Sequence, residues 1–488
     1  MDMVREAARR RPDSPALIAG DSTLTWADLD TRVEAAAGRL AAMCHSPADR
    51  IALVLGNTVD FAVAWFGTLR AGLVAVPLNP GYTADELAHA IADSGAGVVV
   101  GGGLPSVRPE ELTADGPRAG FEPPDRDQLA VLLYTSGTSG RPKGAMLTHR
   151  ALAANHDQLD RIEPAVIGPD DVVLLAVPFF HAYGLNTGLG TVAHHAATGV
   201  LVDRFDPAGS LALIERHGVT VTMGVPSMYA AWSRQPAAVS LRGLRTAVCG
   251  AAPLDPADAE RFTAATGTTV LVGYGLTETA PVLTTTAVSD RTKVGSIGRP
   301  LPGVSLQLRD TDGTVLWQDG TASPEQDLAE LDLSVADVAG TDPGEIVVRG
   351  ANLFSGYWPD GHGGPDPDGW WATGDIAYAD GDGDLVLVDR VGELILVNGF
   401  NVYPAEIERV LDDHPGVAEA AVVGVPHPGA GQAPYAYVVP VGEQQPTAAE
   451  LREYCAERLA RFKLPATFEL VDMLPHSATG KVRKGALR

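Results

Sequence analysis

The sequence predicts an α/β protein with a large N-terminal domain, built of layered α/β structure and a β-rich subdomain, and a small α+β C-terminal domain. Three observations predict it. The 488 residues exceed the usual domain of about 100–150 residues, so at least two domains are expected. Short apolar runs alternate with helical stretches in the first half, as in buried parallel strands with crossover helices. After Gly298 the sequence pattern changes to short apolar segments separated by turn residues, which indicates antiparallel strands.

The predicted parallel strands follow one another along the first half of the chain. They are IALVL (51–55), VVV (98–100), LLYT (132–135), VVLLAV (172–177), VTVTM (219–223) and VLVGY (270–274). These runs are rich in Val, Ala and Leu, which is typical of strands buried on both faces. Beyond residue 298, SLQLRD, EIVVRG and DLVLVDR stand among DG, PG and GDGD turns and predict hairpins.

The last hundred residues form a unit of their own. Residues 401–417 predict a strand, a turn and a helix, 418–426 and 433–440 predict strands, and 447–462 predict an amphipathic helix. Between the two regions, residues 310–345 hold ten acidic and no basic residues, so we expect the stretch 321–340 to be a solvated loop or short helix.

Composition limits the function classes. Lys and Arg number 36 against 61 Asp and Glu, a formal charge of −25, which disfavours a broad nucleic-acid or anionic-membrane surface. Cys44, Cys249 and Cys455 are far apart, so neither a disulfide framework nor a zinc cluster is supported, and a reducing cytoplasm is expected. The sequence shows neither a signal-peptide core nor a run of about 18 apolar residues, so we expect a soluble protein without a membrane span.

The most informative segment is YTSGTSGRPKG at residues 134–144, between an apolar strand and a helical run. Its glycines let the backbone approach an anion, its hydroxyls and amides donate to phosphate oxygens, and a lysine adds charge. A Walker A loop is excluded because Pro142, five residues after Gly137, stands where that motif needs its second glycine. A nucleophile elbow is excluded because Arg141 stands two residues after Ser139, where that motif needs glycine. A Gly/Ser surface turn is the alternative. The predicted phosphate-binding residues are Thr135, Ser136, Gly137, Thr138, Ser139, Gly140 and Lys143.

Further motifs follow in order, so that the sequence resembles the adenylate-forming superfamily, in its acyl-CoA synthetase or fatty acid–CoA ligase branch. They are PFFHAYG (178–184), CGAAPL (249–254), GYGLTET (273–279), WWATGD (370–375), DRVGELILVNGFNVYPAEIE (389–408) and TGKVRK (479–484). The resemblance extends over roughly residues 20–488.

The resemblance implies an ATP site. Tyr274 then packs on adenine, Thr277 contacts the α-phosphate and Glu278 binds Mg²⁺, roles that suit an aromatic ring, a hydroxyl and a hard carboxylate oxygen. Asp375 matches the acid that accepts the ribose hydroxyls, and Arg390 the arginine that reaches ribose and phosphates. The remaining expected nucleotide positions are Gly250, Ala251, Ala252, Gly273 and Gly275.

The resemblance also implies a mobile C-terminal domain, so the expected domains are 1–389 and 390–488. Lys481 matches a lysine that touches the attacking carboxylate and the α-phosphate. After adenylation this domain turns about Asp389 and brings Gly399 and Phe400 to a thiol channel. The chain departs from the family pattern at Gly392, Leu396 and Gln432, which bears on the CoA site. Chance motifs are weaker: His45 to Asp49 fits an acyltransferase His-x3-Asp, and residues 188–193 half-fit a dinucleotide loop, without the required context.

The expected reaction uses ATP, Mg²⁺ and CoA to convert a small carboxylic acid to its CoA thioester. By resemblance His181 lines and gates the acid pocket. An amino acid is disfavoured, because its buried amine needs an acidic partner and His181 follows Phe180 where that acid would stand. Fatty, aryl and short acids remain, in that order. A carrier-protein thiol is an alternative acceptor, and the chain is expected to be a monomer or homodimer.

Two other function classes stay open at this stage. A non-catalytic relative that only binds a nucleotide predicts ATP binding without acid-dependent release of pyrophosphate. A hydrolase that uses Ser136 or Ser139 predicts activity without ATP and labelling by a serine-directed phosphonate.

Overall fold

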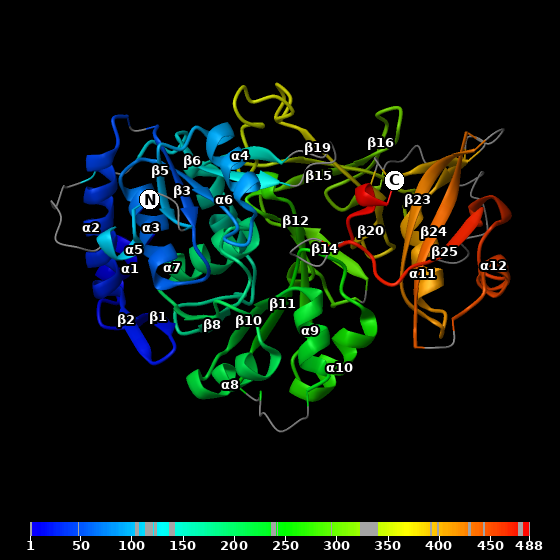
Figure 1. Cartoon of the computed structure of the whole chain (residues 1–488), viewed down its shortest axis with the longest axis horizontal. Helices are drawn as coiled ribbons and strands as arrows, with labels where there is room; N and C mark the ends of the chain where they lie inside the picture. The colour runs from blue at the N-terminus through cyan, green and yellow to red at the C-terminus, as the bar shows by residue number, and fades with distance from the viewer. Residues whose placement is uncertain are drawn as a thin grey trace. The chain divides into compact units, whose positions relative to one another are not determined.

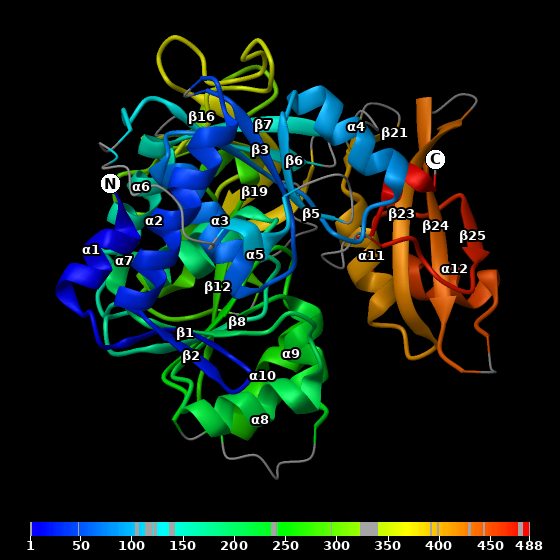
Figure 2. The same ribbon diagram turned by 60° about the vertical axis from the view of Figure 1, so that its left-hand side comes forward.

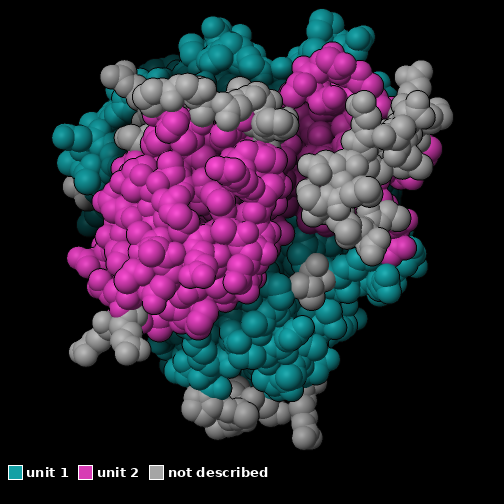
Figure 3. Space-filling view, turned by 90° about the vertical axis from the view of Figure 1, so that its right-hand side faces the viewer, with its two compact units in different colours: residues 1–137, 141–304, 349–371 teal, residues 138–140, 305–348, 372–488 magenta. Residues whose placement is uncertain are grey.

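The computed structural model describes most of the chain, namely residues 2–46, 48–102, 107–112, 121, 124–135, 142–235, 241, 243–293, 295–322, 340–390, 393–397, 400–427, 431–442, 445–476 and 482–487. The chain divides into two compact units (Figure 3): residues 1–137, 141–304 and 349–371 belong to the first, and residues 138–140, 305–348 and 372–488 to the second. The expected domain boundary after residue 389 falls inside the second unit and stays a prediction.

The first unit contains a five-stranded sheet in the order β5-β3-β4-β6-β7. Its strands are β3 (Arg50–Val54), β4 (Val74–Pro77), β5 (Val98–Gly101), β6 (Leu129–Thr135) and β7 (Lys143–Thr148). The pairs β3–β4, β3–β5 and β4–β6 are parallel, while β7 returns antiparallel to β6. Consecutive residues of β3 and β4 are buried, so both faces of the sheet are covered, which explains the apolar runs.

A second sheet of this unit has the order β14-β13-β12-β11-β10-β8-β9-β1-β2. The strands are β1 (Pro15–Ala19), β2 (Ser22–Thr25), β8 (Val172–Leu175), β9 (Thr198–Leu201), β10 (Val221–Gly224), β11 (Thr246–Cys249), β12 (Val270–Gly275), β13 (Val282–Thr285) and β14 (Ser296–Pro300). From β9 through β8, β10 and β11 to β12 the neighbours are parallel, and β13 is antiparallel to both β12 and β14. The predicted parallel strands are therefore confirmed, divided between two sheets.

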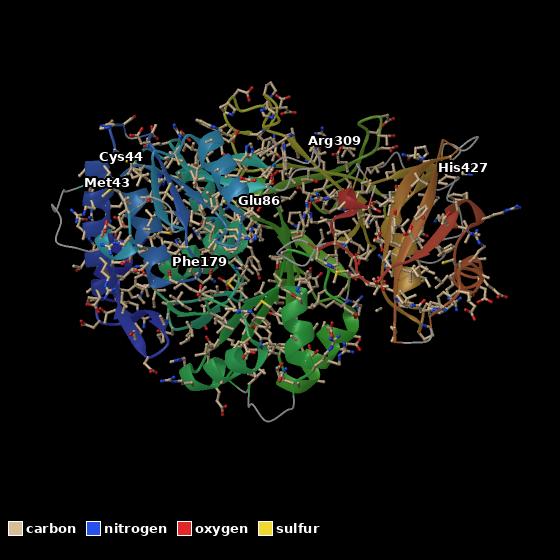
Figure 4. All side chains as sticks on the ribbon, in the orientation of Figure 1. Met43, Cys44, Glu86, Phe179, Arg309 and His427 are labelled. Carbon is tan, nitrogen blue, oxygen red and sulfur yellow. The ribbon has the colours of Figure 1, made fainter. Side chains whose placement is uncertain are left out.

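Helices of the first unit pack on these sheets, as Figure 1 and Figure 2 show. They are α1 (Met3–Arg10), α2 (Trp26–Met43), α3 (Val59–Arg70), α4 (Ala84–Ser94), α5 (Pro109–Leu112), α6 (His149–Leu159), α7 (Thr191–His195), α8 (Pro207–His217), α9 (Pro226–Ser233) and α10 (Pro256–Thr266), with a π-helix, η1, at Tyr183–Gly190. Capping boxes start α2 and α4, the latter through Thr83 and Glu86, a residue labelled in Figure 4. Among the described residues, the helices are too short or too polar to cross a membrane.

The second unit contains a sheet in the order β17-β16-β15-β18-β19-β20. Its strands are β15 (Ser305–Arg309), β16 (Val315–Gln318), β17 (Thr321–Ala322), β18 (Gly344–Arg349), β19 (Trp371–Ala379) and β20 (Leu385–Arg390). The pairs β15–β16, β16–β17 and β19–β20 are antiparallel, as the turn-rich sequence predicts. The expected acidic loop lies mostly outside the described residues, although Thr321 and Ala322 at its start form a short strand.

A smaller sheet of the second unit has the order β22-β21-β24-β23, with β25 beside β24. It comprises β21 (Ile395–Val397), β22 (Phe400–Val402), β23 (Val417–His427), β24 (Gly431–Pro440) and β25 (Thr467–Leu470), and it packs with α11 (Pro404–Asp412) and α12 (Ala448–Ala456). A cluster of buried aliphatic side chains joins these helices to the sheet. The strands and helices predicted for the last hundred residues are confirmed, except that the helix predicted over 447–462 ends at Ala456 and a 3₁₀ turn follows at Arg461–Lys463.

Candidate active site

Three of the motif segments meet at one edge of the second sheet. PFFHAYG follows β8, CGAAPL starts at the end of β11, and GYGLTET contains the end of β12. Because β8, β10, β11 and β12 are parallel neighbours, their carboxyl ends lie at the same edge. Open α/β sheets bind ligands outside the carboxyl ends of their strands. Folding thus gathers residues that are far apart in the sequence.

The phosphate-loop motif lies at the hairpin between β6 and β7. Thr135 and Lys143 are paired in the β6–β7 ladder, so the two ends of the loop lie side by side. Ser136, Gly137, Thr138, Ser139 and Gly140 lie outside the described residues. The structure therefore brings Thr135 and Lys143, which lie on either side of the loop, next to each other.

Lys143, Tyr357 and Glu278 form a connected series in the first unit. The Lys143 ammonium lies 5.2 Å from the centre of the Tyr357 ring, a cation–π distance. The Tyr357 hydroxyl donates a 2.6 Å hydrogen bond to Glu278 Oε1. Glu278 is only 7% exposed, and no described residue donates to its Oε2. Tyr357 was not predicted from the sequence.

The turn that carries Thr277 and Glu278 needs an unusual backbone. It is a 3₁₀ turn, η2 (Thr277–Thr279), directly after β12. A Cβ on Gly275 would lie 1.8 Å from the carbonyl oxygen of Pro281, so only glycine fits there. Leu276 N donates to Thr279 Oγ1 at 3.0 Å, and that hydroxyl also bonds Pro281 O. The turn is therefore tightly closed on itself.

Buried amide side chains hold this turn from outside. Asn352 Nδ2 donates to Thr279 O at 2.8 Å, and Asn186 Nδ2 donates to Ala280 O at 2.7 Å. Asn155 bonds both backbone groups of Val282, and Gln158 Nε2 donates to Asn352 Oδ1 at 3.0 Å. We call Asn155, Gln158, Asn186 and Asn352 the amide network. All four are buried, and none of their side-chain polar atoms is left without a hydrogen-bond partner. Sequence reasoning missed them.

A backbone segment around Tyr357 joins this turn to β7. Phe354 N donates to Glu278 O at 2.8 Å, and Trp358 N donates to Gly144 O at 2.8 Å. Between them, Met146 N donates to Gly356 O at 3.1 Å. The hydrogen bonds connect the motif with Glu278 to the strand that begins with Lys143.

The predicted nucleotide positions around Tyr274 occupy the ends of β11 and β12. Tyr274 is 9% exposed, and Ala251 has φ +73°, which a close turn requires. A Cβ on Gly250 would lie 3.4 Å from the Tyr183 ring, whereas Gly273 has its nearest such neighbour at 3.8 Å. Gly250, Ala251 and Ala252 thus lie at the same sheet edge as Gly273 and Gly275. Their contact with adenine stays a prediction.

His181 lies between β8 and the π-helix η1. Its ring centre is 4.8 Å from that of Phe180, and its Nε2 is buried without a hydrogen-bond partner among the described residues. Burial lowers the pKa of His181 to about 4, so the imidazole is neutral at pH 7. The preceding Phe179, labelled in Figure 4, packs on Phe61 at 5.3 Å in the core. The assigned gating role is untested.

Asp375 and Arg390 face each other in the second unit. They are paired in the β19–β20 ladder, and Arg390 Nε donates to Asp375 Oδ1 at 2.7 Å. The Asp375 side chain is 8% exposed and that of Arg390 43%. Gly374, which lies within β19 directly before the acid, has φ +78°, a left-handed backbone conformation that glycine adopts without strain. The two residues expected at the ribose are therefore adjacent.

Near the predicted hinge, the second unit contains a half-buried charge cluster of Lys484, Glu393 and Glu408. Lys484 Nζ lies 2.8 Å from Glu393 Oε2 and 2.8 Å from Glu408 Oε1. Burial works to lower the pKa of Lys484, but the charges of Glu408 and Glu393 outweigh it and the pKa is raised. Asp389 accepts from Ala405 N at 3.0 Å, and burial raises its pKa.

Several expected residues of the second unit are not placed. Lys481, Gly399 and Gly392 lie outside the described residues, as do the side chains of Leu396 and Phe400. Phe400 begins β22, and Gln432 pairs with Pro426 between β24 and β23. His45 and Asp49 form a local loop in which His45 N donates to Asp49 Oδ2 at 2.7 Å.

The fold defines an α/β protein whose motif segments meet at the carboxyl edge of a parallel sheet, where open α/β sheets bind ligands. The chain belongs to the AMP-binding enzyme family: residues 4–358 match the model of the AMP-binding enzyme, and residues 406–481 match that of its C-terminal domain. It is an enzyme of the acid–thiol ligase class.

Similar proteins agree with this assignment. A feruloyl-CoA synthase from Amycolatopsis sp is 36% identical over 503 residues, which cover 99% of this chain and 96% of that protein. A long-chain-fatty-acid–CoA ligase from Yersinia pestis is 32% identical over 548 residues, covering 100% and 93%. The structure of an o-succinylbenzoate coenzyme A synthetase from Bacillus subtilis, in complex with ATP and magnesium ion, matches with a TM-score of 0.86 and 30% identity, covering 100% and 99%.

ATP, Mg²⁺, CoA and a small carboxylic acid are typical of this family. The residues present fit the metal: Glu278 offers a buried carboxylate whose Oε1 is oriented by Tyr357 and whose Oε2 has no described donor. Magnesium prefers such oxygen ligands.

Proposed function

We propose that the protein is an AMP-forming acyl-CoA synthetase for a medium- or long-chain fatty acid. The acid's carboxylate attacks the α-phosphate of ATP, releasing pyrophosphate and giving an acyl-adenylate. The thiol of CoA then attacks the acyl carbonyl, and AMP leaves. The observation that carries the proposal is the meeting of the PFFHAYG, CGAAPL and GYGLTET segments at one sheet edge, with the buried Glu278 among them.

The first unit supplies the groups that bind phosphate in this proposal. Lys143 and Thr277 neutralise charge on the phosphates, and the Tyr357 hydroxyl orients the Glu278 carboxylate. When bound by Glu278, magnesium supplies positive charge that opposes the charge building on the phosphate oxygens. The amide network keeps the turn of Thr277 and Glu278 in place, so little reorganisation is needed during the reaction.

The second unit supplies the remaining groups. Asp375 and Arg390 are assigned to the ribose, and Lys481 to the attacking carboxylate and the α-phosphate. Lys481 leaves before the thiol enters, with rotation about Asp389, and Gly399 and Phe400 then face the thiol.

The neutral His181 supports an uncharged acyl chain. Its low pKa keeps the imidazole without charge at pH 7, and no carboxylate follows Phe180 in the motif that could pair a substrate amine. An apolar acid therefore suits this side of the site better than an amino acid.

An aryl acid is the second candidate, since a feruloyl-CoA synthase is 36% identical over nearly the whole chain. The deciding experiment measures acid-dependent pyrophosphate release, with and without CoA, for saturated fatty acids of increasing length, a hydroxycinnamic acid and a short acid.

A preference that rises with chain length supports the proposal, and a preference for the hydroxycinnamic acid supports the second candidate. CoA-dependent turnover assigns the acceptor, whereas turnover only with an acyl-carrier protein assigns the carrier thiol. ATP binding without acid-dependent pyrophosphate release identifies a non-catalytic relative. Ester cleavage without ATP, blocked by a serine-directed phosphonate, identifies a hydrolase.

A further inference from the structure

Two histidines and an aspartate form a cluster that the proposed reaction does not use. His194 Nε2 lies 2.7 Å from Asp160 Oδ2, and His195 Nε2 lies 3.2 Å from Asp160 Oδ1. One ligand atom from each residue can be chosen so that all three lie within 4.8 Å of one another. Both imidazoles therefore direct the same ring nitrogen at one carboxylate.

The cluster joins two helices that come from distant parts of the sequence. Asp160 is the residue that ends α6, and His194 and His195 are the last residues of α7. Ala196 ends α7 with a left-handed φ of +55°, so both histidines stand in the final helical turn. The π-helix η1 runs directly into α7, which sets the rotation of the two imidazoles about the helix axis.

The surroundings hold the first imidazole in place. The His194 ring is stacked on the buried His156 ring, with centres 5.1 Å apart and planes 12° apart. Its backbone oxygen accepts a 2.6 Å hydrogen bond from Arg10 of α1, and α1 packs beside α7 (Figure 1, Figure 2). The three side chains are 18%, 20% and 37% exposed for His194, His195 and Asp160. An ion can reach them, while their positions are largely fixed.

We propose that Asp160, His194 and His195 bind a divalent first-row transition metal ion, zinc foremost. Two imidazole nitrogens and one carboxylate oxygen form a mixed nitrogen and oxygen ligand set that suits Zn²⁺ far better than Mg²⁺ or Ca²⁺. A water molecule completes a tetrahedron. The ring proton of each histidine resides on Nδ1 when Nε2 binds the ion. The two Asp160 oxygens lie between the imidazoles. The three side chains therefore need to move only slightly apart to make room for the ion.

The bound ion ties the end of α6 to the end of α7. Helix α6 carries Asn155 and Gln158, and η1, which continues into α7, carries Asn186. These are members of the amide network. The proposed zinc site is thus a structural site that fastens the helices that carry three of the four network residues, and it is independent of the acid that the enzyme uses.

The first experiment measures zinc binding to the metal-free full chain by equilibrium dialysis, in excess Mg²⁺ and without ATP. We expect one zinc ion per wild-type chain. His194→Gln and His195→Gln each keep a group that can hydrogen-bond Asp160 but remove an imidazole ligand. We therefore expect each variant to lose the tightly bound zinc ion. His89→Gln changes an exposed histidine of α4 and should retain it.

The second experiment compares the melting temperature in zinc and in a chelator. At zinc concentrations about a hundredfold above Kd, binding to the folded state alone raises Tm by about 3 °C or more. Wild type and His89→Gln should show this shift, and the two ligand variants should not. If wild type binds no zinc tightly, or if the ligand variants bind it as wild type does, the proposal is wrong. If His194→Gln lowers Tm by the same amount in zinc and in chelator, the cluster consists of ion pairs only.

Discussion

In the first unit the turn of Thr277 and Glu278 is held by neutral amides, whereas in the second unit Arg390 and Lys484 are held by carboxylates. The amide network is buried, and its hydrogen bonds to the backbone of the turn cannot break without leaving buried polar groups unpaired. The Arg390–Asp375 pair and the Lys484 cluster join groups that can exchange one charged partner for another. The difference is what the proposed function requires of a fixed phosphate site and of a domain that moves.

The largest expected effect comes from Lys481, the residue proposed to contact both the attacking carboxylate and the α-phosphate. Lys481→Ala should lower acyl-adenylate formation by about a factor of 10³, because charge that builds during the attack loses its neutralising partner. Thioester formation from supplied acyl-adenylate should stay largely intact. Pyrophosphate release and thioester formation are measured separately. Equal loss of both half-reactions would falsify the role of this lysine.

The next largest effect is expected from a substitution that disrupts the charge cluster of the second unit. Lys484→Met leaves Glu408 and Glu393 without their cation, which should lower the free energy of unfolding by about 3 kcal/mol. Burial raises the pKa of Glu408, so the folded state takes up a proton there more readily than the unfolded chain. The stability of the variant should therefore recover as pH falls and decline as pH rises through that pKa.

Denaturant unfolding across pH measures this effect, and Lys484→Met combined with Glu408→Gln is the matched control. The double variant has lost one of the two unpaired carboxylates, so it should regain part of the stability and lose most of the pH dependence. A single variant as stable as wild type at all pH values would show that the cluster contributes nothing.

The corresponding change in the first unit removes a neutral partner. Asn352→Leu deprives Thr279 O and Gln158 of their hydrogen bonds, and each unpaired buried group costs about 1–3 kcal/mol. We expect the free energy of unfolding to fall by about 2 kcal/mol. This loss should be the same between about pH 5 and 8, because the amide does not titrate in that range. Adenylation should also be slower. Gln445→Ala, at an exposed amide of the second unit, should change neither quantity. A loss that follows pH as that of Lys484→Met does would contradict the comparison.

The elements that position the site could largely be predicted from the sequence. Apolar runs without alternation predicted β3, β8, β10 and β12, and the GYGLTET motif placed Glu278 just after a strand. The phosphate-loop motif was expected to lead directly into a helix, so the strand β7 that Lys143 begins was missed. These predictions depend on local patterns, and a pattern such as GYGLTET fixes its own turn because Gly275 has no room for a side chain.

The supporting residues could not be predicted, because their partners are distant in sequence. Tyr357 bonds Glu278 across 79 residues and Asn352 bonds Thr279 across 73. Asn and Gln are surface residues by default, so nothing in their local sequence indicates burial. The same holds for the pairing of Asp160 with His194 and His195, which only the packing of α7 reveals.

A smaller effect sharpens the role of Tyr357. Tyr357→Phe keeps the ring beside Lys143 but removes the hydroxyl that bonds Glu278. A hydrogen bond to a charged group contributes about 1.5–3 kcal/mol, so kcat/KM for ATP should fall by about tenfold or more. The requirement for Mg²⁺ should rise, because the carboxylate is less well oriented.

Titration of the rate with Mg²⁺ at saturating ATP checks the role of Tyr357. Tyr82→Phe, at a partly buried tyrosine of the same unit for which no hydrogen bond to the hydroxyl is described, is the control and should behave as wild type. An unchanged Mg²⁺ requirement in Tyr357→Phe would mean that the hydroxyl does not orient the Glu278 carboxylate.

The smallest effect concerns His181 and appears only in acid. Burial lowers its pKa from 6.5 to about 4, so the unfolded chain binds a proton that the folded protein excludes. The stability associated with neutral His181 is complete above pH 6.5 and is lost as pH falls towards 4, by at most about 1.4 kcal/mol per pH unit. His181→Gln should therefore lose less stability than wild type between pH 6.5 and 5.5, by about 1 kcal/mol. Unfolding by urea at both pH values measures the difference, with His89→Gln as the exposed control. If His181→Gln and wild type lose stability in parallel, His181 has the same pKa in the folded protein as in the unfolded chain, and the support that a buried neutral imidazole gives to an apolar acid is lost.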